Sequence, residues 1–192
     1  MTLAFTNDYF KHTLPEGNAN CNTNLIKWIP PDLGFLKINC DASLDDNVGG
    51  TDFVIRNNSG DCLVVSGASA PASNILHLEA TAVKNALMFA FDQALPNFVV
   101  ESDSKILIDV INNTTPVPWS ISSTIDDILY LKNFYNVVNF VFSFRKKNKA
   151  AHWVANHAKI SRDSFVWHSS RPPDLESILY FDLFAPSFRR VN

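Results

Sequence analysis

The chain is predicted to be an α/β domain with a five-stranded mixed sheet flanked by about four helices. Residues 36 to 70 show the two-residue alternation of strands, interrupted by short polar turns. Residues 76 to 161 alternate segments of helical period with β-branched and aromatic runs. Three antiparallel strands followed by alternating helices and strands require the later connections to cross over the sheet, which makes the sheet mixed.

The composition favours one folded domain inside the cell. Hydrophobic residues make up 46% of the sequence, which is enough for a sizeable core. No apolar run reaches the roughly 18 residues of a membrane span, and Asp8, Lys11 and His12 interrupt any signal-peptide core. The three cysteines are too scattered for a disulfide framework or a zinc site. We therefore expect a monomer of the nucleus or cytoplasm that is neither secreted nor attached to membranes.

We expect three regions along the chain. Residues 1–27 are rich in Asn and Thr and show no sustained period, so they are predicted to form a flexible leader. The domain spans residues 28–161 and begins at Trp28-Ile29-Pro30-Pro31, where the paired prolines stop any regular element. Residues 162–192 show little periodicity before Leu175, and we expect a loosely packed C-terminal tail that is able to dock back on the domain.

Residues 35–43 are predicted to form the strand around which the domain is organised. Leu36, Ile38 and Cys40 share one face of this strand, and Asp41 lies on the other. Burying a carboxylate is costly without a compensating cation or donor, so Asp41 needs a reason to end an apolar strand. Either local groups satisfy it, as in a turn whose side chains cap the backbone, or it coordinates a cation.

Four further strands are predicted. Residues 50–57 and 62–70 complete an antiparallel meander with the first strand, because a tight turn at 57–61 joins them. Residues 98–102 and 137–144 have the β-branched and aromatic content of strands and follow helical segments.

The first predicted helix carries a second acid. Residues 76–93 contain no Gly or Pro and are flanked by prolines on both sides. Val83 and Leu87 follow Glu79 at i+4 and i+8, which places Glu79 on the apolar stripe of this helix. We therefore expect Glu79 to face the sheet.

Three more helices are predicted, at residues 104–112, 120–133 and 149–161. Asp103 stands between a strand and the first of these helices, where it serves either as a helix N-cap or as a member of a site. His152 lies on the flank of the apolar stripe of the last helix.

Asp41, Glu79 and Asp103 occupy places that this topology can bring together. Carboxylates gathered at strand ends repel one another and raise each other's pKa, and a divalent cation relieves that repulsion. Oxygen ligands suit Mg²⁺ or Mn²⁺, which take phosphate-bearing substrates as further ligands. The three acids therefore indicate phosphodiester chemistry.

Several motifs occur in a characteristic order and spacing over residues 28–161. They are Trp28-Ile29-Pro30-Pro31 with Leu36-Lys37-Ile38-Asn39-Cys40-Asp41-Ala42-Ser43, Val54-Ile55-Arg56-Asn57, His77-Leu78-Glu79-Ala80, Val100-Glu101-Ser102-Asp103-Ser104 and Ala151-His152-Trp153-Val154-Ala155. On these motifs the sequence resembles the ribonuclease H-like domain found widely in plants. It is similar, more distantly, to the ribonuclease H regions of reverse-transcribing elements. The resemblance implies the ribonuclease H-like fold.

The resemblance also implies a reaction, which is cleavage of the RNA strand of an RNA/DNA hybrid by two divalent cations, Mg²⁺ or Mn²⁺. By position, Asp41 would bridge both cations, with Glu79 and Asp103 completing the ligand set. The family's fourth acid falls where this chain has His152. A neutral imidazole can be a ligand there, as in Argonaute-type members of the fold; the alternative is a helix residue at the solvent boundary with no ligand role.

Two further positions depart from the family pattern. Asp52 stands in the second strand where the family usually has a glycine. It would either crowd the strand or add an acid near the site. Ala42 replaces another common glycine, which we expect to be harmless.

Basic residues between the last strand and the last helix are candidates for binding phosphates. They are Arg145, Lys146, Lys147 and Lys149, and the alternative is a solvated turn or a short localisation signal. Asn74, just before the Glu79 helix, is a candidate reader of the hybrid's 2′-hydroxyls.

Two other functions stay open from the sequence. One is a catalytically silent module that binds nucleic acid, because His152 replaces the fourth acid. The other is a protein-interaction domain that uses the aromatic residues of the C-terminal tail, namely Phe165, Trp167, Tyr180, Phe181, Phe184 and Phe188.

Overall fold

The computed structural model describes residues 27–95 and 97–184, and all structural statements refer to these residues. The predicted leader lies outside this part of the chain except for Lys27. Phe188 of the predicted tail lies outside it as well. The described elements follow the predicted order up to the helix at Lys149–Ser161, and one more strand and one more helix come after that helix.

The first three strands form the predicted antiparallel meander. β1 (Leu36–Asp45) pairs with β2 (Val48–Arg56), which pairs with β3 (Cys62–Pro71). Asp46 and Asn47, between β1 and β2, both have positive φ angles, 45° and 62°. A two-residue hairpin turn requires this conformation, and Asn and Asp adopt it more readily than other side chains. The turn therefore sets the register of the β1–β2 pair.

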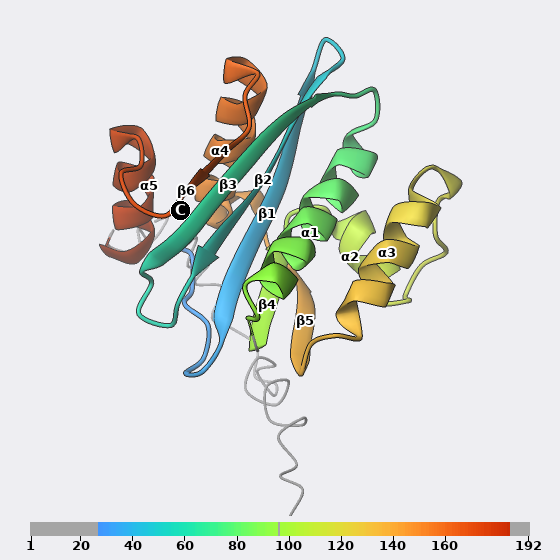
Figure 1. Ribbon diagram of the computed structural model, residues 1–192, viewed down its shortest axis with the longest axis horizontal. Coiled ribbons are helices and arrows are strands. Elements are labelled where there is room, and N and C mark those ends of the chain that lie inside the picture. Colours follow the sequence, from blue (N-terminus) through green and yellow to red (C-terminus); the bar gives the residue numbers. More distant parts are fainter. Residues whose placement is uncertain (1–26, 96, 185–192) are drawn as a thin grey trace, which may run out of the picture. The chain divides into compact units, whose positions relative to one another are not determined.

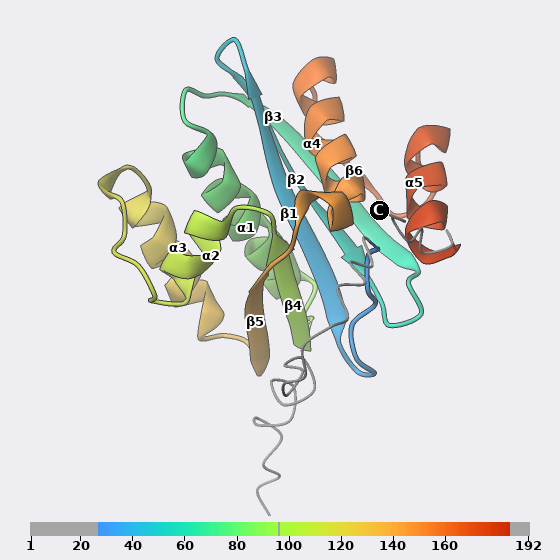
Figure 2. The same cartoon turned by 180° about the vertical axis from the view of Figure 1, so that it is seen from behind.

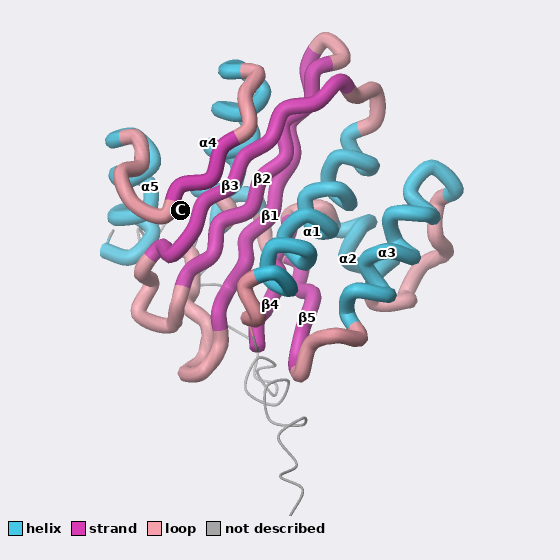
Figure 3. Tube along the Cα trace, viewed as in Figure 1, coloured by secondary structure: helices cyan, strands magenta, loops and turns pink. Residues whose placement is uncertain are grey.

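Alternating helices and strands complete the predicted part of the sheet. α1 (Ile75–Asp92) leads into β4 (Asn97–Ser102), while α2 (Lys105–Ile111) and α3 (Ser122–Lys132) lead into β5 (Val137–Phe142). β4 pairs in parallel with β1, and β5 pairs in parallel with β4. Both connections therefore cross over the sheet, as the sequence predicts. Figure 3 shows the strands as one continuous sheet.

Two short 3₁₀ turns join these elements to the last predicted helix. One, Trp119–Ile121, precedes α3, and the other, Arg145–Lys147, connects β5 to α4 (Lys149–Ser161). Ala151, Val154 and neighbouring small residues of α4 are buried against the sheet.

The C-terminal region differs from the prediction. β6 (Phe165–Trp167) pairs antiparallel with β3, so the sheet has six strands in the order β5-β4-β1-β2-β3-β6 instead of five. α5 (Pro173–Phe184) is a fifth helix, and its Leu175 and Leu179 are buried. The predicted boundary after residue 161 is therefore wrong, because β6 extends the sheet and α5 packs on it. A three-residue strand and a helix with apolar residues on several faces give no periodic signal.

Two apolar cores lie on opposite faces of the sheet. The first core contains Ile55 and side chains of α1, α2 and α3, and the second contains Val54 and side chains of α4 and α5. Neighbouring residues of a strand point to opposite faces, which explains this division. Figures 1 and 2 show α4 and α5 apart from the other three helices. No described helix combines the length and the apolar character needed to cross a bilayer.

α4 approaches β2 closely at Gly50. A Cβ atom at this position would lie 2.1 Å from the carbonyl oxygen of Ala155 and 2.8 Å from the backbone nitrogen of Lys159. Only glycine therefore permits this distance between α4 and the sheet. The close approach keeps His152, on α4, next to Asp41 on β1.

A buried polar network ties the start of the domain to α5. It consists of Trp28, Asn39, Arg56 and Asp182. Asn39 Oδ1 accepts hydrogen bonds from Trp28 Nε1 at 2.8 Å and from Arg56 Nη2 at 3.2 Å. Arg56 also pairs with Asp182 at 2.9 Å, and its guanidinium lies 3.6 Å from the centre of the Trp28 ring. The network fixes both ends of the domain on β1 and β2.

Candidate active site

Three predicted acids meet where β1 and β4 lie side by side. Cys40 on β1 pairs with Ser102 on β4 in parallel register, so Asp41 and Asp103, the next residue of each segment, are neighbours. Glu79, in the first turns of α1, reaches the same place. One carboxylate oxygen from each acid lies within 4.8 Å of the others. The prediction that the topology gathers these residues is confirmed.

Burial and mutual repulsion raise the pKa of two members of the acidic cluster, which is made up of Asp41, Glu79 and Asp103. Burial, followed by the charges of Asp41 and Asp103, raises the pKa of Glu79 from 4.5 to about 9. Burial and then Asp41 raise the pKa of Asp103 from 3.8 to about 6. Glu79 Oε2 is buried and has no hydrogen-bond partner. Such uncompensated carboxylates are costly in a folded protein and are typical of functional sites.

Asp41 is held from two sides. Its Oδ1 accepts a hydrogen bond from the Ala42 N–H at 2.8 Å, and its own N–H donates to Asp52 Oδ1 at 2.9 Å. Asp52 is 2% exposed, and its Oδ2 has no partner. Burial and then the charge of Asp41 raise the pKa of Asp52 well above its ordinary value. Asp52 therefore adds an acid beside the cluster, as one of the two interpretations of this position expected.

His152 hydrogen-bonds to Asp41 and lies outside the compact group of three acids. Its Nδ1 lies 2.9 Å from Asp41 Oδ2, and Asn156 Nδ2 lies 3.0 Å from its Nε2. The imidazole is thus placed beside the cluster. A role as the fourth cation ligand stays a prediction.

The basic residues divide into two groups. Arg145 reaches the site, since its Nη2 lies 3.1 Å from both ring nitrogens of His152. Lys146 is exposed and Lys147 half-buried on the same 3₁₀ turn. Lys149 acts electrostatically on a carboxylate of α5, so it lies toward that helix. Arg145 is therefore the basic residue of this segment for which the structure records a contact with the site.

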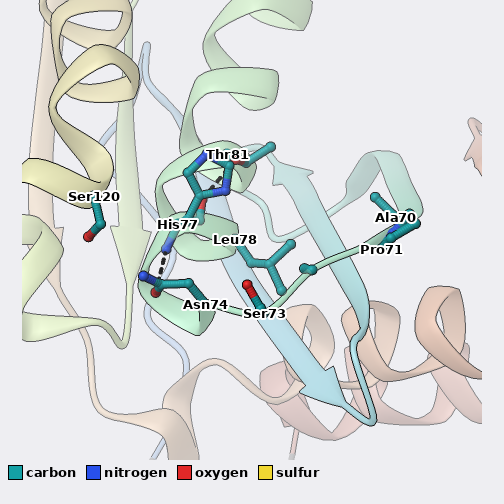
Figure 4. Close-up of a pocket in the computed structure, with 9 residues that line it drawn as sticks. Ala70, Pro71, Ser73, Asn74, His77, Leu78, Thr81 and Ser120 are labelled. Atoms are coloured by element: carbon teal, nitrogen blue, oxygen red, sulfur yellow. Dashed lines mark hydrogen bonds between the residues drawn. The ribbon is translucent and has the colours of Figure 1, made fainter.

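Asn74 caps α1 and lines a cavity of about 340 Å³ at the start of that helix (Figure 4). Asn74 Oδ1 accepts a hydrogen bond from the His77 N–H at 3.3 Å. Ser73, Thr81 and Ser120 also line the cavity. Ala70, Pro71 and Leu78 line it too, and none of the three acids does.

Two residues near the site were missed by the sequence reasoning. Asn148 donates from Nδ2 to the Cys40 carbonyl oxygen at 2.8 Å, and its Oδ1 is buried without a partner. Asn156 contacts His152, and its Oδ1 accepts from Ser43 Oγ at 2.8 Å. The helical i+4 spacing of Asn156 from His152 is a signal that could have found it. Asn148 has no comparable signal, because its partner is 108 residues away.

The donor set of the cluster fits a hard divalent cation. All three groups are carboxylates, and one of the oxygens, Glu79 Oε2, is buried without any partner. Mg²⁺ and Mn²⁺ prefer such oxygen donors. Asp41, Glu79 and Asp103 are thus the residues that could hold a metal.

Comparison with solved structures supports the fold. A ribonuclease H1 from Halobacterium salinarum superposes with a TM-score of 0.63 at 14% identity, covering 67% of this chain and 99% of that one. The N-terminal ribonuclease H domain of a Mycobacterium tuberculosis protein gives 0.61 at 19% identity, with 66% and 94% covered. LC11-RNase H1, isolated from compost and crystallised with an RNA/DNA hybrid, gives 0.59 at 20% identity, with 66% and 98% covered.

The sequence itself also matches a known family. No match to the chain is found among curated proteins. The family model described as reverse transcriptase-like matches residues 39–158, which include Asp41, Glu79, Asp103 and His152. The chain therefore belongs to the reverse transcriptase-like family and has its ribonuclease H-like domain.

Proposed function

We propose that the protein is a metal-dependent endonuclease that hydrolyses the RNA strand of RNA/DNA hybrids. The observation that carries this proposal is the acidic cluster, in which oxygens of Asp41, Glu79 and Asp103 lie within 4.8 Å of one another. The reverse transcriptase-like family and the similarity to ribonuclease H1 structures, one of them in complex with an RNA/DNA hybrid, support the substrate class.

Each residue of the site has a role in this proposal. Asp41, Glu79 and Asp103 would hold two divalent cations, Mg²⁺ or Mn²⁺, with His152 at the fourth ligand position. When bound, these cations supply activation of the attacking water and stabilisation of the leaving 3′ oxygen. The Ala42 N–H donates to the Asp41 carboxylate, and Asp52 accepts a hydrogen bond from the Asp41 backbone N–H. Both bonds keep Asp41 in place, which reduces the reorganisation needed on binding.

Substrate contacts would come from both sides of the cluster. Arg145, Lys146 and Lys147 lie on the turn before α4 and would bind phosphates, so affinity should fall as salt rises. Asn74 lines the cavity at the start of α1 and would contact a sugar of the hybrid there. Lys149, directed toward α5, would contribute less than the other three basic residues.

Cleavage of a labelled RNA/DNA duplex tests the proposal, with Mg²⁺ and Mn²⁺ assayed separately. Asp41→Asn should lower the rate at least about a hundredfold, because it removes a charge shared by the whole ligand set. Asp127→Asn is the control, since Asp127 is an exposed acid on α3 with a side chain 59% accessible. Parent and His152→Asp proteins that both fail to cut in either metal would refute the enzyme.

A second function has one specific observation in its favour. His152 hydrogen-bonds to Asp41 where the family has an acid, so the site lacks one negative ligand. The protein would then be a catalytically silent module that binds nucleic acid. Salt-sensitive binding of the duplex without cleavage would support this module over the enzyme.

A further inference from the structure

Arg145 places a positive charge beside the acidic cluster. Its Nη2 lies 3.1 Å from both His152 ring nitrogens, and His152 Nδ1 lies 2.9 Å from Asp41 Oδ2. One imidazole therefore separates the guanidinium from the Asp41 carboxylate, and the guanidinium charge opposes the rise in the pKa of Glu79 and of Asp103.

The backbone around Arg145 is anchored. The Asn148 N–H donates to the Arg145 carbonyl oxygen at 3.0 Å, and Asn148 Nδ2 donates to the Cys40 carbonyl oxygen at 2.8 Å. The turn that carries Arg145 is thus attached to β1 directly beside Asp41. Lys146 follows Arg145 on this turn and is exposed, and the described part of the chain contains no hydrogen bond or ion pair from its side chain.

We propose that Arg145 is the internal counter-cation of the metal-free cluster, and that a divalent cation must displace it to enter. The inference rests on the proposed function, since it concerns the same cation site. A guanidinium keeps its charge at every physiological pH, so it can offset part of the repulsion among the three carboxylates. Its position against the His152 ring, next to Asp41, also repels an incoming cation.

The contact between Arg145 and His152 raises the metal concentration that is needed to fill the site. The site loses one favourable ionic interaction each time a metal enters, so the apparent affinity for metal is lower than the carboxylates alone would give. Once displaced, the guanidinium is free to pair with a phosphate of the bound hybrid. Arg145 is therefore a positioning residue that couples metal entry to substrate binding.

Metal affinity measured without nucleic acid tests the proposal. Mn²⁺ binding to the full-length chain is followed by electron paramagnetic resonance for the parent, Arg145→Gln and Lys146→Gln. Arg145→Gln should bind Mn²⁺ about threefold to tenfold more tightly, because a repelling charge has been removed. Lys146→Gln, the matched loss of one charge on the same turn, should stay within about twofold of the parent.

Thermal unfolding gives a second measurement that does not depend on activity. In chelator, Arg145→Gln should unfold at a lower temperature than Lys146→Gln, since the cluster has lost its counter-ion. Saturating Mn²⁺ should remove this difference, because the metal replaces the missing charge. Equal Mn²⁺ affinities for Arg145→Gln and Lys146→Gln would overturn the inference.

The outcomes separate this inference from the proposed function. If the parent binds Mn²⁺ and cuts the hybrid while the two variants behave alike, only the role of Arg145 is refuted. If Arg145→Gln binds Mn²⁺ more tightly and the parent cuts nothing, the counter-cation role is supported and the enzyme is not. If no protein binds Mn²⁺, both fail together.

Discussion

Two polar regions lie two residues apart on β1 and differ in how their charges are balanced. At Asn39, the buried polar network pairs Arg56 with Asp182 at 2.9 Å. Arg56 Nε has no hydrogen-bond partner there, but the guanidinium charge has an anion. At Asp41, three carboxylates and the neighbouring Asp52 lie together, and Glu79 Oε2 and Asp52 Oδ2 are buried without a hydrogen-bond partner. The same strand and the same sheet therefore carry one region of matched charges and one of unmatched charges.

The comparison shows which buried charges serve the fold and which serve a site. In the network, burial lowers the pKa of the Arg56 guanidinium, and the charge and hydrogen bond of Asp182 oppose that shift. In the cluster, burial and repulsion act in the same direction and raise the pKa of Glu79 and of Asp103. Removing either charge should destabilise the first region, whereas removing a carboxylate charge should relieve the repulsion in the second.

The largest effect is expected in the network. Asp182→Ala leaves the Arg56 guanidinium buried without its anion, which should lower the free energy of unfolding by about 3–5 kcal/mol. Urea denaturation measures the loss. Glu176→Ala is the control, because its ion pair with Arg171 has a carboxylate that is 47% exposed, and such a pair contributes at most about 1 kcal/mol. Equal losses for the two variants would contradict the distinction between the regions.

The cluster should make the metal-free protein less stable as pH rises. The pKa of Glu79 is raised from 4.5 to about 9, so the folded state binds this proton more tightly than the unfolded state. The resulting stabilisation is complete below the unfolded pKa and is lost as pH rises through the folded pKa. The free energy of unfolding should therefore fall by on the order of 2 kcal/mol across this range.

Denaturation in chelator at a series of pH values measures this slope. Glu79→Gln should flatten it, since the titrating group is gone. Saturating Mg²⁺ should raise the stability of the parent most at the alkaline end, where the carboxylates are charged. A stability that increases with pH over the same interval would contradict this prediction. It would mean that other groups compensate the negative charges of the cluster in the folded state.

Asp52→Asn should stabilise the metal-free protein by about 1–2 kcal/mol at pH 8. Asparagine keeps the oxygen that accepts the hydrogen bond from the Asp41 N–H and removes a buried acid whose pKa is raised by burial. Well below pH 4 the gain should vanish, because the aspartate is then protonated in both states. Asp45→Asn, at a residue 73% exposed, is the control and should change stability little at either pH.

The smallest effect concerns the fourth ligand position. His152→Asp should tighten Mn²⁺ binding about tenfold, because it restores a negative ligand. The metal-free protein should become less stable in return, since a further acid joins the repulsion. Calorimetric titration with Mn²⁺ measures the affinity, and His168→Asp, at an exposed position after β6, is the control. An unchanged affinity would show that residue 152 lies outside the metal shell.

The elements with strong periodicity could be predicted from the sequence. The β1 alternation around Asp41 and the α1 stripe that includes Glu79 are local patterns, and the structure confirms both. The position of Asp103 after β4 follows in the same way. Parallel pairing of β1 with β4 then brings the acids together, because residues that follow paired positions become neighbours.

The partners of buried polar groups could not be predicted. Asp182 pairs with Arg56 across 126 positions of sequence, and Asn148 donates to the Cys40 carbonyl across 108. Neither residue stands out locally, since an Asp or an Asn in a polar stretch is most often exposed. The burial of α5, which the sequence treated as a loose tail, depends on such long-range contacts.

The sequence by itself determined the order of strands and helices up to α4 and the three acids of the cluster, because hydrophobic period and spacing are local properties. Only the tertiary structure decided that β6 and α5 belong to the domain, that Asp52 lies against Asp41, and that Arg145 reaches the site through His152. These contacts depend on the distances between elements far apart in the chain. Side-chain packing sets those distances, and it depends on residues from several segments at once, so the pattern of one segment cannot predict them.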